Sequence, residues 1–557
     1  MSKSENGEFD YVVVGAGTAG CVVAARLTED PDVRVLLLES GPADKHPLIP
    51  VPTAWLGLFG TEVDYAYRTT PQPGLGGAEM SWPRGHTVGG SSSINGMVYL
   101  RGHRDDYDSW ERQFGATGWS YREVLPYLRK AETVPGADPT WRGLDGPMRP
   151  ARAGDPHPLS EVFLAAAAAA GYPISADLNG AQAEGAGWND LAIHDGRRQS
   201  IADGYLKPVL SRPNLTVATG SRATRLLVAA GQCVGVSYSQ DGQIKQARAE
   251  AEVILSAGAI DSPRLLLLSG IGPADELRSA GVQVLHDLPG VGRNLHDHPL
   301  TSVVYSTIRE SPAGSNSSGE VSLSWRSDSA LTGPDMQLLF SHVPFHLPTL
   351  QSPPDSFTFC LTTVPDSRGS IRLRDADPTS SPLIDPKVLT EPRDLTRLVD
   401  AIAVAREIAQ QSPFDPWRGE EVLPGPAATS HDELVDFVRR ATGPYFHPVG
   451  TCAMGTGPDA VVDTQLRVLG LPGLRVVDAS IMPKIVSVNT NVAVTMIAER
   501  AAALLASKRS PLTESQPTAA CHEASDARPA GSPAAAGSAG GVRRDAGDVL
   551  KPFGRTS

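Results

Sequence analysis

The sequence FDYVVVGAGTAGCVVAARLTEDPDVRVLLLE occupies residues 9–39 and decides the fold. It opens with a short apolar, β-branched run and then passes through GAGTAG at residues 15–20. A helical pattern follows, and a second apolar run ends on Glu39. A strand, a glycine-rich turn, a helix and a second strand with a terminal acid are typical of a Rossmann-type unit that binds a dinucleotide.

Each glycine of this turn has a physical role. Gly15 permits the tight turn, Gly17 lets the backbone approach a pyrophosphate, and Gly20 lets the helix pack closely on the strand. The free N–H groups of the helix N-terminus attract phosphate, and Glu39 lies where it can accept from a ribose hydroxyl. The predicted contacts are Gly15, Gly17, Thr18, Ala19, Gly20 and Glu39. The motif serves FAD and NAD alike, so it does not choose the cofactor.

Length and composition fit a globular enzyme. The chain has 557 residues, of which 41% are hydrophobic and 20% charged, enough for two domains or one large composite. The net charge of −13 comes without a basic stripe, which argues against a nucleic-acid partner.

The five cysteines are scattered and odd in number, and they form no CxxC pair. This usage predicts free thiols in a reducing compartment, so we expect a cytoplasmic protein. The N-terminus MSKSENGEFD lacks an apolar core, so no signal peptide is expected, and no apolar stretch is long enough to predict a transmembrane segment. An alanine-rich run at residues 164–170 predicts a buried helix.

The rest of the chain divides into regions with different patterns of apolar and polar residues. Short β-like runs and a helix at 262–269 occupy the region 215–292, whereas alternating β patterns at about 300–390 predict an antiparallel sheet. An α/β class follows, with a discontinuous cofactor domain and an inserted α+β substrate domain. The predicted cofactor domain is 1–155, 215–300 and 455–507, the substrate domain is 156–214 and 301–454, and a Ser/Pro/Ala/Gly-rich disordered tail is 508–557.

Two further stretches carry a family resemblance. Residues 85–107 read GHTVGGSSSINGMVYLRGHRDDY, and residues 258–272 read GAIDSPRLLLLSGIG. Both resemble signatures of the glucose-methanol-choline (GMC) oxidoreductases, which are FAD enzymes, and the likeness is greatest to the choline dehydrogenase-like branch. It runs from about residue 9 to about residue 506. The resemblance implies FAD rather than NAD.

The resemblance also implies where the flavin is held. Glycines at 89 and 90 leave room for backbone against a flat ring, and Ser91 and Asn95 offer small polar groups. Some family members tether FAD through a histidine where this chain has Ile94, so non-covalent FAD is expected. In the second stretch, Ser262 predicts a helix cap. The implied flavin contacts are Val88, Gly90, Ser91, Asn95, Gly96, Met97, Val98, Ala223, Asp478, Ala479, Asn489 and Thr490.

Alcohol oxidation on a flavin needs a base for the hydroxyl proton while hydride passes to flavin N5. The chain has 13 histidines, so residue type alone selects none. The segment YFHPVGTCAMG at 445–455 resembles the active-site segment of the family. The resemblance implies His447 as the general base and Asn491 as the second catalytic residue, which orients the substrate oxygen. The implied reaction converts a primary alcohol into an aldehyde.

Other polar clusters have plainer interpretations. The His-Asp-His sequence at 296–298 lacks further ligands at useful spacing, so no metal is expected. His342 and His346 alternate along a predicted strand and could line the substrate pocket or simply pack. Four aromatic residues could form an apolar wall or belong to the core: Trp325, Phe345, Tyr445 and Phe446.

Several alternatives stay open. Choline-specific oxidation would place a trimethylammonium group in an aromatic cage with a carboxylate, which the sequence does not locate. A lyase that keeps FAD without redox chemistry, as hydroxynitrile lyases of this family do, is a second alternative, and a non-catalytic flavoprotein is a third. The electron acceptor, oxygen or a quinone-type carrier, and the oligomeric state are not determined by the sequence.

Overall fold

The quoted N-terminal stretch forms the strand, turn, helix and strand that its pattern predicts. In the computed structural model, which describes residues 8–507, β1 (Glu8–Val14) leads through the glycine-rich turn into α1 (Thr18–Leu27). β2 (Val35–Leu38) then pairs with β1 in parallel. The predicted disordered tail at 508–557 lies outside the described residues.

The first sheet has seven strands in the order β10-β2-β1-β13-β12-β11, with β24 beside β13. β10, β2, β1, β13 and β24 pair in parallel, whereas β13, β12 and β11 form an antiparallel extension. The further strands are β10 (Leu215–Ala218), β11 (Ser221–Ala229), β12 (Gln232–Gln240), β13 (Gln243–Leu255) and β24 (Leu474–Val476). This is the predicted Rossmann-type architecture, assembled from separate parts of the chain.

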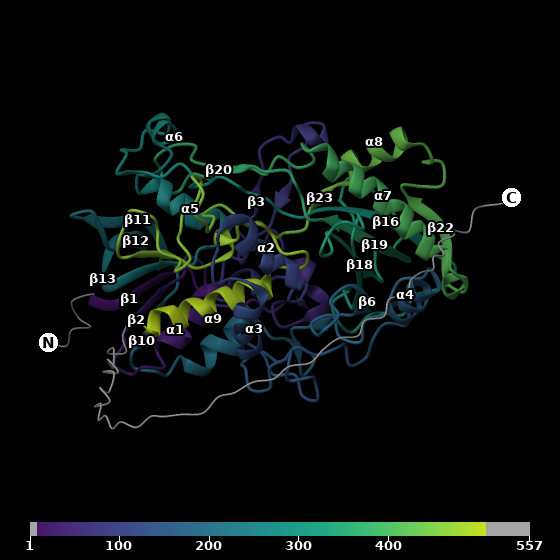
Figure 1. The fold of residues 1–557 in the computed structure, drawn as a ribbon, viewed down its shortest axis with the longest axis horizontal. Coiled ribbons are helices and arrows are strands. Elements are labelled where there is room, and N and C mark those ends of the chain that lie inside the picture. Colours follow the sequence, from purple (N-terminus) through teal and green to yellow (C-terminus); the bar gives the residue numbers. More distant parts are fainter. Residues whose placement is uncertain (1–7, 508–557) are drawn as a thin grey trace, which may run out of the picture. The chain divides into compact units, whose positions relative to one another are not determined.

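The C-terminal helix returns to this sheet. α9 (Asn491–Ser507) packs against α1, and Figure 1 shows the two helices together below the strands, with α5 (Gly258–Leu268) above them. The buried carboxylate of Glu499 on α9 pairs with Arg26 of α1 at 2.7 Å. Packing and this charge pair fix the start of α9 beside the glycine-rich turn.

The second sheet is antiparallel and also has seven strands, in the order β22-β16-β19-β18-β17-β6, with β23 beside β16. Its strands are β6 (Gly185–Trp188), β16 (Pro299–Thr307), β17 (Val321–Trp325), β18 (Met336–Ser341), β19 (Ser356–Thr363), β22 (Arg418–Leu423) and β23 (Gly443–Pro444). The helices α4 (Pro158–Ala169), α7 (Pro392–Ala409) and α8 (His431–Ala441) share its apolar core. The predicted antiparallel sheet is confirmed (Figure 1).

Shorter elements complete the described chain. Three helices, α2 (Arg104–Phe114), α3 (Tyr121–Lys130) and α6 (Ala274–Ser279), belong to the first part. The two-stranded pairs are β3 (Tyr67–Arg68) with β4 (Ser81–Trp82), β5 (Val98–Tyr99) with β7 (Asp190–Leu191), β8 (Ile193–His194) with β9 (Arg197–Arg198), β14 (Ile271–Gly272) with β15 (His286–Asp287), and β20 (Ser370–Arg372) with β21 (Leu383–Asp385). In residues 8–507 no helix is long and apolar enough to cross a membrane.

Two local predictions are corrected. The helix expected to begin at Ser262 begins at Gly258, so Ser262 lies inside α5, where its Oγ accepts from the backbone N–H of Ala257 at 3.0 Å. The turn at 202–206 lies in the segment predicted to belong to the substrate domain. In the structure it packs on α1, which belongs to the predicted cofactor domain. The exact domain boundaries therefore stay a prediction.

Candidate active site

A large cavity extends from the carboxyl ends of β1 and β2 to the loop that carries His447. It encloses about 2060 Å³ of empty space, part of it open to solvent. Its lining runs from the glycine-rich turn to His447, so one continuous cavity connects the dinucleotide motif with the predicted base.

Glycines shape the dinucleotide end. Gly15 has a φ of 98°, and a Cβ there would lie 2.5 Å from the carbonyl oxygen of Ser256. A Cβ on Gly20 would lie 1.8 Å from the carbonyl oxygen of Gly15, which agrees with a role in packing the helix against the strand. Gly17 caps α1 without a side-chain hydrogen bond, so the first-turn N–H groups remain available to an anion.

The Glu39 carboxylate lies at the same end of the cavity. It accepts hydrogen bonds from the backbone N–H groups of Ala16 at 2.9 Å and Gly41 at 2.8 Å. Burial raises its pKa to about 7. The carboxylate still lines the cavity, so the ribose contact stays a prediction that the geometry permits.

Most residues predicted from the sequence line this one cavity. They are Gly15, Gly17, Thr18, Ala19, Glu39, Gly90, Ser91, Asn95, Gly96, Met97, Val98, Ala223, His447, Asp478, Ala479, Asn489, Thr490 and Asn491. Gly20 and Val88 are not among its lining residues; Val88 is buried, and its carbonyl accepts from Ser93 Oγ at 2.8 Å. Asp478 already accepts from Gly258 N–H at 2.8 Å and from Ser262 Oγ at 2.5 Å, which leaves its backbone as the better contact for a ligand.

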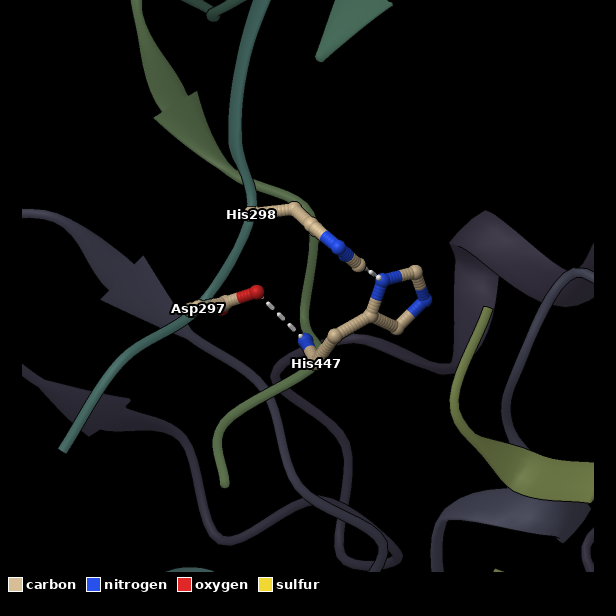
Figure 2. A group of neighbouring side chains, drawn as sticks. All are labelled: Asp297, His298 and His447. Atoms are coloured by element: carbon tan, nitrogen blue, oxygen red, sulfur yellow. Dashed lines mark hydrogen bonds between the residues drawn. The ribbon is translucent and has the colours of Figure 1, made fainter. Parts of the chain in front are cut away.

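His447 is held by a second histidine. His298 immediately precedes β16, and β16 pairs with β23, so the Tyr445 N–H donates to the His298 carbonyl at 3.1 Å. Figure 2 shows the result: the Nδ1 atoms of His298 and His447 lie 3.0 Å apart. The backbone N–H of His447 donates to Asp297 Oδ1 at 2.8 Å.

These contacts assign the tautomer of His447. The Asn489 amide nitrogen, Nδ2, lies 3.2 Å from His447 Nε2 and can only donate, so Nε2 is the acceptor. The ring proton then lies on Nδ1 and is donated to His298. Burial, with His298 and Arg84 nearby, lowers the pKa of His447 well below 6.5, so the ring is neutral. His447 and Asn489 both line the cavity, so a substrate hydroxyl that replaces the Asn489 amide at Nε2 can give its proton to the neutral imidazole.

Asn491, predicted to be the second catalytic residue, lines the cavity but is hydrogen-bonded away from His447. Asn491 is the first residue of α9, and its Oδ1 accepts from Thr18 Oγ1 at 2.7 Å, at the start of α1. The amide beside His447 belongs to Asn489, which the sequence assigned only to the flavin. The sequence Asn-Thr-Asn offers two amides, and which one meets the histidine depends on where α9 begins.

The histidine cluster is compact enough to raise the question of a metal. Ligand atoms of Asp297, His298 and His447 lie within 4.8 Å of one another. Asp297 accepts from His447 N–H and from Trp82 Nε1 at 2.9 Å, and the two Nδ1 atoms bond to each other. These bonds use the atoms that a metal would need, so we interpret the cluster as a hydrogen-bonded support for His447.

Aromatic rings cover the cavity near His447. Phe345, Tyr445 and Phe446 line it, as one interpretation of the sequence expected, whereas Trp325 does not. Sequence analysis missed Trp55 and Phe59, both in the 3-10 turn η2 (Pro52–Leu58) or just after it. The Trp55 ring stacks on that of Phe345 at 6.0 Å, and the Phe59 ring meets that of Phe446 at 5.3 Å. No charge or motif in that segment marks these two residues.

The two histidines at 342 and 346 do not line the cavity. The His342 ring stacks on that of His157 at 4.1 Å, and His346 Nε2 bonds to Ser352 Oγ at 2.9 Å. Both are therefore packed residues of the second sheet and its loops.

Comparison with known proteins agrees with this geometry. The chain matches the GMC oxidoreductase family over residues 9–300 and 365–498. It is 42% identical to the mitochondrial choline dehydrogenase of Mus musculus, over 89% of this chain and 89% of that protein. It is 38% identical to the "alcohol dehydrogenase [acceptor]" of Pseudomonas putida, over 90% and 96% of the two chains.

Solved structures show the same fold. Pyridoxine 4-oxidase from Mesorbium loti superposes with a TM-score of 0.86 at 37% identity, over 89% of this chain and 98% of the other. A variant of the Aspergillus oryzae formate oxidase, studied for its FAD modification, gives a TM-score of 0.83 at 28% identity, over 90% and 98%.

Proposed function

This chain belongs to the GMC oxidoreductase family and is an FAD-dependent oxidoreductase acting on CH–OH donors, and we propose that it oxidises a primary alcohol to the aldehyde with His447 as the general base. The observation that carries the proposal is the position of His447, which lines the dinucleotide cavity with its Nε2 3.2 Å from the Asn489 amide.

The described residues fit FAD. Close glycine contacts leave the space along α1 free of side chains, and a Cβ on Gly90 would lie 2.7 Å from Gly17 Cα. When bound, the cofactor supplies the hydride acceptor for the carbinol carbon. Ile94 lines the cavity and offers no nucleophile, so we infer that FAD is held without a covalent bond.

His447 Nε2 would take the hydroxyl proton. The bond from Nδ1–H to His298 keeps the ring in the tautomer whose Nε2 carries the lone pair, and it remains in place when the ring becomes cationic. The Asn489 amide that donates to Nε2 has to give way to the substrate hydroxyl before the proton moves. A base positioned in this way contributes about 10²–10⁴-fold to a rate.

Two buried polar atoms at this end of the cavity lack a partner of good geometry. They are Tyr445 OH and Asn489 Oδ1, in the described part of the chain; the Asn489 side chain also lies close enough to the Tyr445 hydroxyl to affect its pKa, and both residues line the cavity. The Tyr445 ring lies 4.4 Å from that of His447. Buried polar atoms are normally paired, so these atoms are suited to contact a ligand hydroxyl directly or through water.

Anaerobic mixing of the holoenzyme with a panel of primary alcohols tests the proposal. Bleaching of the flavin with formation of aldehyde is expected. If no alcohol reduces the flavin, the redox function is wrong and the lyase alternative gains support. Subsequent admission of air, or of a quinone, identifies the electron acceptor.

Choline is the alternative that the names of the relatives favour. An aromatic surround of the kind beside His447 attracts a trimethylammonium group through cation–π contacts. A cytoplasmic location stays a prediction from cysteine usage, because the murine relative is named mitochondrial.

A further inference from the structure

The part of the cavity next to His447 is rich in rings and lacks a carboxylate. We call it the substrate compartment; its walls are Trp55, Phe59, Leu339, Phe345, Cys360, Tyr445 and Phe446. We infer that it takes an uncharged alcohol with an apolar body in preference to a trimethylammonium alcohol. The inference rests on the proposed function and names its substrate class.

The acids that line the cavity are engaged elsewhere. Three acidic residues line the cavity: Glu39, Asp261 and Asp478. Glu39 and Asp478 accept hydrogen bonds from backbone N–H groups at the dinucleotide end. Asp261 accepts from Tyr67 OH at 2.8 Å and from Arg264 at 3.0 Å. None of these carboxylates is bonded to a residue of the substrate compartment, so none is placed to pair with a substrate cation.

Charge near the base is also unfavourable to a cation. Arg84 lines the cavity, and its Nη2 donates to the carbonyl of Phe446 at 2.6 Å, next to His447. Asp297 lies behind His447, where its oxygens accept from His447 N–H and Trp82 Nε1, and it does not line the cavity. The Arg84 guanidinium is therefore a positive charge on the cavity wall at the loop that carries His447.

The magnitudes favour the uncharged ligand. A cation over an aromatic face gains about 0.5–2 kcal/mol, whereas taking an unpaired ion out of water costs several kcal/mol. Without a carboxylate the rings alone do not offset the desolvation. An apolar body instead gains about 25 cal/mol for each Å² removed from water.

The wall geometry fits such a body. Leu339 and Cys360 are register partners on β18 and β19, and they face the Tyr445 side of the compartment. The stacked rings of Trp55 and Phe345 form another wall. Tyr445 OH and Asn489 Oδ1 lie at the His447 end, where a hydroxyl would bind, and the uncharged residues Ser317, Ser318 and Ser341 also line the cavity. The walls thus combine apolar and neutral polar groups and offer no carboxylate to a cation.

Choline and 3,3-dimethylbutan-1-ol provide the decisive test, because they have nearly the same shape and differ in charge. We expect the second-order rate of anaerobic flavin reduction to be at least about tenfold higher for the neutral alcohol, which corresponds to about 1.4 kcal/mol. A rate for choline equal to or above that of the neutral alcohol overturns the inference and leaves the proposed function standing. Failure of every alcohol to reduce the flavin overturns both.

A pair of arginine variants tests the origin of the preference. Arg84→Gln should reduce the ratio of neutral to choline rates several-fold, whereas Arg309→Gln, at an exposed arginine that does not line the cavity, should leave the ratio unchanged. If Arg84→Gln retains FAD and the parent ratio, the Arg84 charge does not exclude cations. The comparison of the two alcohols in the parent enzyme remains decisive if Arg84→Gln does not fold.

Discussion

Asn489→Ala and Asn491→Ala should separate chemistry from cofactor binding, although the two residues are only two positions apart. Asn489 Nδ2 lies 3.2 Å from His447 Nε2, so when a substrate hydroxyl takes its place at Nε2 the amide can donate to the substrate oxygen as negative charge develops. Asn491 Oδ1 is bonded to Thr18 Oγ1 at 2.7 Å, at the glycine-rich turn. We therefore propose that Asn489 acts on the reacting atoms and that Asn491 stabilises the junction of α1 and α9.

The expected magnitudes follow from these bonds. A hydrogen bond to a charged group is worth about 1.5–3 kcal/mol, so Asn489→Ala should slow flavin reduction about 10- to 150-fold. Asn491→Ala loses a neutral hydrogen bond worth about 0.5–1.5 kcal/mol. That loss should appear as weaker FAD retention and a lower Tm, with flavin reduction in the loaded enzyme nearly unchanged.

Anaerobic stopped-flow of the FAD-loaded variants measures the limiting reduction rate, and FAD content and Tm are measured on the same preparations. A primary isotope effect with α-deuterated alcohol shows whether hydride transfer limits the rate. If Asn491→Ala slows reduction and Asn489→Ala does not, the assignment of the amide beside His447 is wrong.

Four further outcomes follow from the site. His447→Ala should keep FAD and slow flavin reduction about 10²-fold or more, and a parent rate in stopped-flow would show that another group is the base. His298→Phe should slow reduction less than His447→Ala, whereas His298→Asn, whose amide oxygen can accept from Nδ1–H, should recover part of the rate; equal rates for the two variants would contradict a role in setting the tautomer. The pKa of His447 is lowered well below 6.5, mainly by burial and also by His298 and Arg84. Protonation therefore removes the base only as the pH falls through that lowered value. The acid limb of the kcat/KM profile should lie below pH 6.5. Glu39→Ala should weaken FAD binding, measured by titration of the apoprotein, while the holoenzyme keeps its alcohol KM; unchanged FAD affinity would place the ribose contact elsewhere.

The fold could be predicted because local pattern and backbone chemistry agree. The glycines at 15, 17 and 20 occupy positions where a Cβ would be crowded or where phosphate must approach, and the flanking strands have continuous apolar runs. The antiparallel sheet followed from alternation in the same way. These signals are local, and local signals survive in a single sequence.

The details of the site depend on where distant elements meet, and the sequence does not carry that information. Asn489 and Asn491 differ only in their position relative to the first turn of α9. His298 resembled part of a metal motif, because only the pairing of β16 with β23 brings it to His447. Trp55 and Phe59 are apolar residues in a turn, and only the folded chain turns their faces toward the cavity.

The pairing of β16 with β23 has a consequence for how this enzyme could diversify. His298 lies directly before one strand, His447 lies shortly after the other, and backbone bonds between them keep the two rings in register whatever the neighbouring side chains are. Tyr445 and Phe446 belong to the segment that carries the base, whereas Trp55, Leu339 and Cys360 come from η2, β18 and β19. Substitutions at Trp55, Leu339 or Cys360 can therefore reshape substrate preference without displacing the base, which makes these three positions the natural starting library for directed evolution of new alcohol specificities.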